Sequence, residues 1–160
     1  MLDFLEVPNV LINIRMIIQS MAIGCDHAGF PYKDAIKALL ESKGITVLDK
    51  GTNSLDSVDY PDFVHPVAET LEEGTTQLGV LICGSGNGVS MTANKHQTVR
   101  AALCWNTEIA VMARQHNNAN IISIPARYVS QEVALEMVEA FISTEFEGGR
   151  HDRRVQKMSC

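Results

Sequence analysis

LGVLICGSGNG, residues 78–88, is the most informative stretch of this sequence. Its first six residues, Leu78–Cys83, form a short and wholly apolar run, which is typical of a strand buried on both faces of a parallel sheet. Three alternating glycines then form a turn, and the residues after the turn have the pattern of a helix. A buried strand, a turn and a helix in succession are the building unit of α/β folds.

The same unit repeats on both sides of this stretch. Strands are expected at residues 17–24, 45–48, 78–83, 99–104 and 121–124, and helices at residues 32–43, 63–73, 89–96, about 106–114 and, as the last helix, 133–142. Gly44 and Gly74 follow two of these helices as stop signals, and Asn106 or Thr107 can cap the fourth. The alternation predicts a single-domain, three-layer α/β sandwich with a five-stranded parallel sheet, similar to Rossmann and flavodoxin-like folds.

Length, charge and cysteine content exclude several classes of protein. The 160 residues suit one domain, and thirteen Lys and Arg against nineteen Asp and Glu give a net charge of −6. Nucleic acid and anionic membranes, which attract basic surfaces, are therefore not expected as partners. Residues 1–15 lack a signal-peptide pattern and are taken as an extension of unknown role ahead of a domain at residues 16–160. The cysteines form no C-x-x-C pair, which predicts reduced thiols in a cytoplasmic protein.

Ligands of such folds bind beyond the carboxyl ends of the strands, so the loops there are the first place to look for a site. Asp26 and His27 follow the first strand, Tyr60 follows the second and Arg127 follows the fifth. Each has a less specific alternative: Asp26 can simply stabilise a turn, and Tyr60 can simply pack against the core.

Residues 84–88, the glycine loop, form the strongest candidate at this edge. The backbone N–H groups of Gly84, Gly86, Asn87 and Gly88 can converge on an anion or a developing oxyanion. The spacing matches neither a dinucleotide fingerprint nor a Walker A loop. Cys83, at the entrance of the loop, can act as a base only as a thiolate, and a nearby helix N-terminus and cations are expected to lower its pKa. The alternative is a buried cysteine beside a tight turn.

Other polar residues are expected on the opposite side of the sheet, at the amino ends of its strands. His116 and Asn117 follow a helix and precede a strand, and the tail, residues 147–154, follows the last expected helix. If these residues act together with Cys83, they must come from a second copy of the chain. The order of elements therefore predicts a two-fold dimer in which each chain contributes His116 and its tail to the site of the other.

At this point the motifs resemble those of a known family, the type B ribose-5-phosphate isomerases, whose fold is shared by the galactose-6-phosphate isomerase subunits. The resemblance covers residues 17 to about 157. It is carried by GCDHAG (24–29), DKGT (49–52), DYP (59–61), CGSGNG (83–88), ANK (93–95), RA (100–101), RQHN (114–117), AN (119–120) and EGGRH (147–151).

The resemblance implies an aldose–ketose isomerase that converts ribose 5-phosphate to ribulose 5-phosphate through an enediolate, in the non-oxidative branch of the pentose phosphate pathway, without metal or cofactor. It implies that Cys83 is the base, that Ser85 supplies a hydroxyl beside it, and that His116 opens the sugar ring with Asn117 nearby. It also implies a dimer, or a tetramer built from dimers. The family's contacts to sugar hydroxyls correspond to Asp26 and Tyr60, and its phosphate contacts to His27, Arg127, Arg150 and Arg154.

Two other functions remain open from the sequence. The same scaffold suits an isomerase of allose 6-phosphate or galactose 6-phosphate, because the sequence does not measure the length of the pocket. A non-catalytic phosphate-binding module is the alternative from another class, although the coincidence of Cys83, His116 and the arginines of the tail counts against it.

Overall fold

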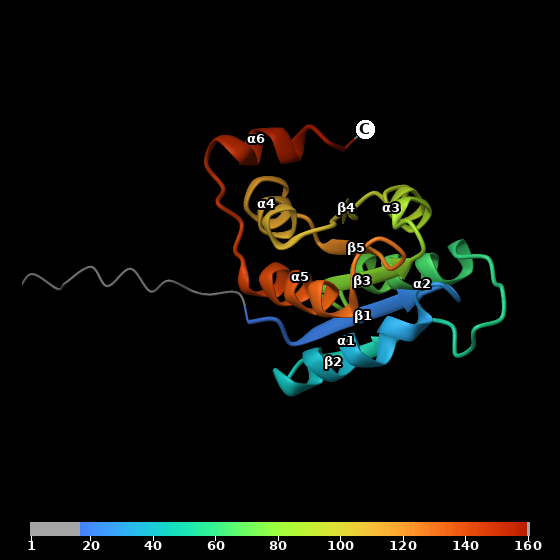
Figure 1. Ribbon diagram of the computed structural model, residues 1–160. Helices are drawn as coiled ribbons and strands as arrows, with labels where there is room; N and C mark the ends of the chain where they lie inside the picture. Colours follow the sequence, from blue (N-terminus) through green and yellow to red (C-terminus); the bar gives the residue numbers. More distant parts are fainter. Residues whose placement is uncertain (1–16, 160) are drawn as a thin grey trace, which may run out of the picture.

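The protein is described here by a computed structural model, which covers residues 17–159. A five-stranded, wholly parallel sheet runs through its centre in the order β2-β1-β3-β5-β4 (Figure 1). The strands are β1 (Ser20–Cys25), β2 (Thr46–Asp49), β3 (Leu78–Cys83), β4 (Ala101–Leu103) and β5 (Ile121–Pro125). The expected extension at residues 1–15 and the last cysteine, Cys160, lie outside the described residues.

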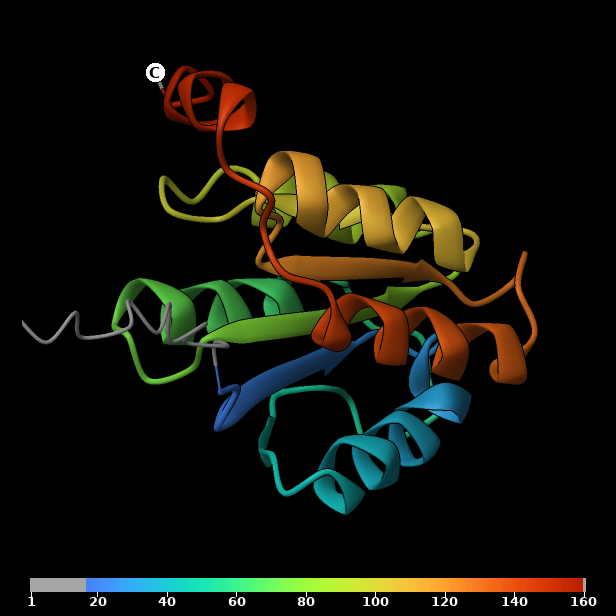
Figure 2. The ribbon, with the colours of Figure 1, turned by 90° about the vertical axis from the view of Figure 1, so that its left-hand side faces the viewer.

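Helices cover both faces of the sheet, as Figure 2 shows from the side. One apolar cluster joins helices α1 (Phe30–Ser42), α4 (Thr107–Asn117) and α5 (Gln131–Ser143) to the sheet. A second cluster joins α2 (Pro61–Glu72) and α3 (Asn87–Ala93) to the opposite face. The predicted three-layer α/β sandwich is confirmed. No helix within residues 17–159 has the length and apolar character needed to cross a bilayer.

Local signals in the sequence explain where several elements begin and end. Gly44 and Gly74 have φ angles of +77° and +73°, a left-handed conformation that glycine adopts without strain after a helix. Asn106 caps α4, because its side chain accepts a hydrogen bond from the backbone N–H of Ile109 at 2.9 Å. The helix after the glycine loop begins at residue 87, two residues earlier than expected.

Strand β4 is shorter than the expected residues 99–104. Asn120 Oδ1 accepts the backbone N–H of Arg100 at 2.7 Å, and the side chain of Asn94 bonds both the N–H and the carbonyl of Ala101. The side chains of these asparagines form hydrogen bonds with backbone groups at the start of β4, and so stabilise this outer strand of the sheet. Asparagines in the ANK and AN motifs therefore have a structural use here.

The tail holds a further helix, so the prediction that residues 133–142 form the last helix is wrong. Helix α6 (Arg150–Gln156) begins after Gly148 and Gly149, whose φ angles are +67° and +57°. Its seven residues, RHDRRVQ, are mostly charged and bury only His151, so they show no apolar periodicity. The helix stands away from the sheet and packs against α4 (Figures 1 and 2).

A buried lysine fixes the loop after β2. Lys33, on α1, is 2% exposed and lies 3.1 Å from the carboxylate of Asp49. Its ammonium group also donates to the carbonyl of Thr52 and to the side chain of Asn53, each at 2.8 Å. Since burying an unpaired charge is costly, these contacts hold the loop and the lysine together beside the end of β1.

Candidate active site

A pocket of about 250 Å³ opens at the carboxyl ends of β1, β3 and β5. Strands β1 and β3 are neighbours whose chain connections leave in opposite directions, the position where ligands bind in such folds. We call it the Cys83 pocket. Its walls are Asp26, His27, Ala28, Tyr60, Cys83, Gly84, Ser85, Gly88, Arg127 and Tyr128.

Asp26 and His27 reach this pocket from the end of β1. The buried carboxylate of Asp26 accepts the backbone N–H groups of Ala28 and Gly29 at 2.9 and 3.0 Å, so it stabilises the turn and also lines the pocket. His27 Nδ1 accepts the backbone N–H of Val58 at 3.3 Å, which ties the loop before α2 to the pocket. Both residues are held in place by the backbone before any ligand arrives.

The glycines of the loop permit contacts that a side chain would block. Gly86 has a φ angle of +74°, which lets the chain turn into α3. A Cβ atom on Gly88 would lie 2.5 Å from the ring of Tyr60, so only glycine leaves room for that ring in the pocket. Of the predicted loop residues, the buried Gly86 and the exposed Asn87 are not among those that line the pocket.

Cys83 ends β3 with its sulfur inside this turn. The residue is 4% exposed, and its Sγ accepts the backbone N–H of Gly86 at 3.1 Å. Burial raises the pKa of Cys83, and backbone N–H groups of Val89, Gly86 and Ser85 offset only part of that rise. The expected lowering of this pKa is therefore wrong for the single chain, because burial outweighs the backbone N–H groups and the negative charge of Asp26 also raises the pKa.

Arg127 and Ser85 lie at the mouth of the Cys83 pocket. The backbone N–H of Arg127 donates to the carbonyl of Gly84 at 3.0 Å, and its side chain passes close over that glycine. Both Arg127 and Ser85 are exposed, and Ser85 Oγ accepts the N–H of Asn87 at 3.3 Å. A guanidinium group and a hydroxyl group are thus available at the opening of the pocket.

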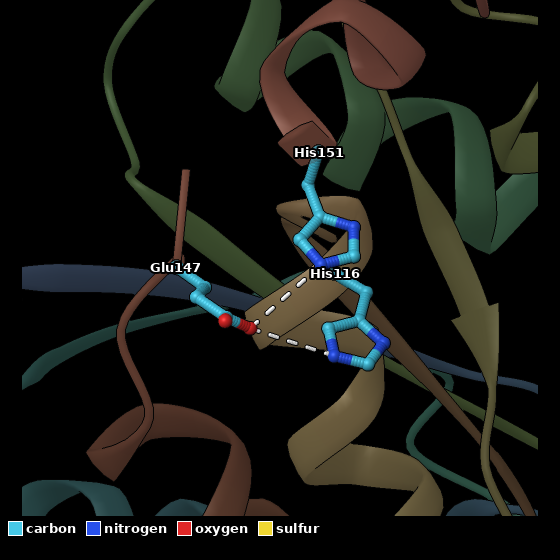
Figure 3. A group of neighbouring side chains, drawn as sticks. All are labelled: His116, Glu147 and His151. Carbon is cyan, nitrogen blue, oxygen red and sulfur yellow. Dashed lines mark ion pairs between the residues drawn. The ribbon is translucent and has the colours of Figure 1, made fainter. Parts of the chain in front are cut away.

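A second cluster of side chains lies on α4 and the tail. His116 Nε2 lies 3.5 Å from the carboxylate of Glu147, and His151 Nε2 lies 3.7 Å from the same oxygen (Figure 3). The two imidazole rings are stacked, with centroids 4.3 Å apart and planes 10° apart. We call His116, Glu147 and His151 the His116 cluster.

The Cys83 pocket contains none of the predicted residues from the opposite edge. His116 and Asn117 end α4, and the exposed Arg150 and Arg154 lie on α6, so the chain does not bring these four residues to Cys83. Asn117 instead lines a larger cavity, of about 700 Å³, beside β4 and α6. Among residues 17–159, no thiol or carboxylate lines that cavity.

The His116 cluster is the only group of three or more His, Cys, Asp or Glu residues within residues 17–159 whose ligand atoms all lie within 4.8 Å. Two histidines and a glutamate form a known zinc donor set. Nearly parallel rings, however, do not direct their Nε2 lone pairs to one point, and Arg150 Nε donates to His151 Nε2 at 3.4 Å. The arrangement suits the handling of a proton better than the binding of a cation.

Residues 21–158 match the family model described as Ribose/Galactose Isomerase. The chain belongs to the ribose/galactose isomerase family. It is 40% identical over 143 residues to ribose-5-phosphate isomerase B of Escherichia coli, covering 89% of this chain and 96% of the relative.

Solved structures of this isomerase family have the same fold. A ribose 5-phosphate isomerase from Thermotoga maritima superposes with a TM-score of 0.85 at 45% identity, over 88% of this chain and 97% of the other. Ribose-5-phosphate isomerase B from Mycoplasma genitalium, solved with bound ribulose 5-phosphate, has a TM-score of 0.84 at 41% identity, over 87% and 93%. The resemblance stated from the motifs is confirmed.

Sequence reasoning did not select four residues that the structure of this isomerase places at the two sites. Ala28 and Tyr128 line the Cys83 pocket, and Glu147 and His151 belong to the His116 cluster. Tyr128 follows β5 directly after Arg127, so the rule that selected Arg127 also applies to it. Glu147 and His151 lie in the EGGRH motif, but only the folded Gly-Gly turn brings them to His116.

Proposed function

We propose that this isomerase interconverts ribose 5-phosphate and ribulose 5-phosphate through an enediolate. The observation that carries the proposal is the sulfur of Cys83, which ends β3 inside a turn of backbone N–H groups and opens to a pocket of about 250 Å³. Named relatives support the substrate, since the relative from Escherichia coli is a ribose-5-phosphate isomerase B and that from Mycoplasma genitalium was solved with ribulose 5-phosphate.

Cys83 acts as the base of the proposed reaction. Its thiolate removes the proton from C2 of the open-chain aldose, and the C1 carbonyl oxygen takes up the negative charge of the enediolate. The proton of the C2 hydroxyl then passes to O1, and Cys83 returns its proton to C1 as the C2 carbonyl forms. Negative charge that develops on oxygen is stabilised by the N–H groups of the glycine loop and by the hydroxyl of Ser85. Asp26 and Tyr60, which also line the pocket, contact the sugar hydroxyls.

The phosphate is held at the mouth of the pocket. His27 and Arg127 line it within one chain, and we propose that Arg150 and Arg154 complete the phosphate site from a partner. Cations from a partner also favour the thiolate of Cys83, whose pKa is raised within the single chain. Binding energy from the remote phosphate then holds the sugar while its bonds change.

The working unit of the proposal is a two-fold homodimer, with a tetramer as a further assembly. The support comes from the order of the elements. The amino ends of the strands, opposite Cys83, are where the chain places His116, Asn117 and the arginines of α6. Helix α6 also stands out from the body of the chain, where a second copy can meet it (Figure 2). In this dimer, His116 opens the sugar ring bound in the partner's pocket, with Asn117 beside it.

The place of the enzyme in metabolism follows from the same proposal. Interconversion of these two pentose phosphates belongs to the non-oxidative branch of the pentose phosphate pathway. Cys25, Cys83 and Cys104 are free and buried, which fits the reducing conditions of the cytoplasm.

A comparison of substrates tests the proposed function. The purified protein is incubated with ribose 5-phosphate or with allose 6-phosphate, and the ketose formed is measured by NMR. We expect kcat/KM for the pentose phosphate to exceed that for the hexose phosphate at least tenfold. A preference for the hexose phosphate would indicate a hexose-6-phosphate isomerase instead. No turnover of either substrate would indicate a phosphate-binding module without catalytic activity.

A further inference from the structure

Glu147 lies where it can control the orientation of His116. Figure 3 shows its carboxylate facing Nε2 of His116, while the other ring nitrogen, Nδ1, points away from the carboxylate. The separation of 3.5 Å is longer than a tight hydrogen bond. Catalytic contacts are often long before a substrate binds and shorten in the complex, so this distance suits a contact that closes during the reaction.

The backbone of the tail holds Glu147 in this position. Its N–H donates to the carbonyl of Gln115 at 3.0 Å, which fastens the tail to the last turn of α4, one residue before His116. Gly148 and Gly149, both with positive φ, then turn the chain so that α6 returns over the same helix end. The carboxylate itself is 59% exposed, so its position is not a requirement of core packing.

His151 supports the other side of the arrangement. It is buried and stacked on His116. Loss of solvent around the ring, together with the positive charges of His116 and Arg150, lowers the pKa of His151. Arg154 also lowers the pKa of His151, whereas the negative charge of Glu147 raises it. Because Arg150 Nε donates to His151 Nε2 at 3.4 Å, that nitrogen acts as an acceptor, and the carboxylate of Glu147 is left to accept the Nε2–H of His116.

We propose that Glu147 is a positioning residue for ring opening: its carboxylate accepts the Nε2–H of His116 and so presents Nδ1 to the sugar. This inference rests on the proposed function. Nδ1 accepts the proton of the anomeric hydroxyl, the C1–O4 bond breaks as the C1 carbonyl forms, and the same proton passes to O4. Loss of the carboxylate leaves the other tautomer and other ring orientations accessible, which slows this step alone.

The test separates ring opening from proton transfer at carbon. Ribose 5-phosphate is mostly a closed ring, whereas ribulose 5-phosphate cannot form a furanose because its O5 carries the phosphate. Exchange of the C1 proton of ribulose 5-phosphate with deuterium from D₂O therefore requires Cys83 but no ring opening. We compare Glu147→Gln with the control Glu145→Gln. Glu145 is exposed and lies two positions earlier, and its substitution changes the charge by the same amount.

We expect Glu147→Gln to lower kcat/KM for ribose 5-phosphate about tenfold, the effect of losing one charge-assisted hydrogen bond, while C1 exchange continues at the rate of the unaltered protein. Glu145→Gln should leave both rates unchanged. An equal loss of turnover and exchange in Glu147→Gln would make its role merely structural and overturn the inference, as would a result identical to Glu145→Gln. Absence of both activities from the unaltered protein would instead overturn the proposed function, and the inference with it.

Discussion

At the scale of single residues, Cys83 combines two opposing influences. Burial raises its pKa, while backbone N–H groups of Val89, Gly86 and Ser85 face the sulfur and favour the thiolate. The raised pKa favours the protonated thiol in the single chain, and a thiol is less readily oxidised than a thiolate. Its place at the end of a wholly buried strand fixes the position of the sulfur.

Replacement of Cys83 by alanine tests its role as the base. We expect Cys83→Ala to abolish turnover of ribose 5-phosphate and deuterium exchange at C1 of ribulose 5-phosphate, because no other thiol of the described part of the chain lines the pocket. Binding of substrate, measured by calorimetry, should be nearly unchanged, since His27 and Arg127 remain. Turnover at the rate of the unaltered protein would show that another group is the base.

The raised pKa of Cys83 also predicts how its reactivity depends on pH. Only the thiolate reacts with iodoacetamide, and below the pKa its fraction rises about tenfold per pH unit. We expect the alkylation rate at Cys83, followed by mass spectrometry without substrate, to rise from pH 7 to pH 9 without a plateau. Burial raises the pKa of Cys25 and of Cys104 to about 12, so these two thiols should remain unmodified. A plateau below pH 8 at Cys83 would contradict a raised pKa in the assembled protein and would show that cations from a partner outweigh burial.

At the scale of secondary-structure elements, Lys33 joins α1 to the loop after β2. Replacing it with methionine keeps the volume but removes the donor for Asp49, Thr52 and Asn53. We expect Lys33→Met to lower the free energy of unfolding by about 2–3 kcal/mol, because buried acceptors are left without a partner. Urea unfolding followed by circular dichroism gives this value.

Lys37→Met is the matched control for this measurement. Lys37 lies 3.8 Å from the same carboxylate, but its side chain is 35% exposed. An exposed ion pair of this kind contributes little, so the control should change the free energy of unfolding by less than about 0.5 kcal/mol. Equal losses in the two variants would show that the effect comes from net charge and not from the buried contacts of Lys33.

The elements also show how far the sequence could predict the fold. Leu78–Cys83 is predicted to the residue, because a short and wholly apolar run followed by a glycine-rich turn is typical of a strand buried on both faces of a parallel sheet. Helix α6 was missed because its seven residues bury one side chain and owe their position to two left-handed glycines and to α4. The shortening of β4 depends on asparagines 94 and 120, whose partners are distant in sequence.

At the scale of the whole molecule, the alternation of strands and helices determines which edge each loop occupies, so the separation of Cys83 from His116 could be predicted from the sequence. The strand order could not, because β5 lies between β3 and β4 only through long-range packing of similar apolar runs. The His116 cluster could not be predicted either, since its three members meet only after α6 has folded back over the end of α4.

If each site takes Cys83 from one chain and His116 from the other, two defective variants should repair one another. Cys83→Ala and His116→Ala are purified separately, mixed in equal amounts, unfolded and refolded together. In a mixed dimer, one site receives the intact Cys83 of one chain and the intact His116 of the other, while the second site lacks both.

Random pairing makes about half of the dimers mixed, and each mixed dimer holds one working site of two. We therefore expect the refolded mixture to recover about one quarter of the specific activity of the unaltered protein treated in the same way. Each variant refolded alone measures the residual activity to be subtracted. A site built within one chain would gain nothing from mixing, because every chain in the mixture carries one of the two lesions, so an activity equal to the average of the two variants would refute the shared site.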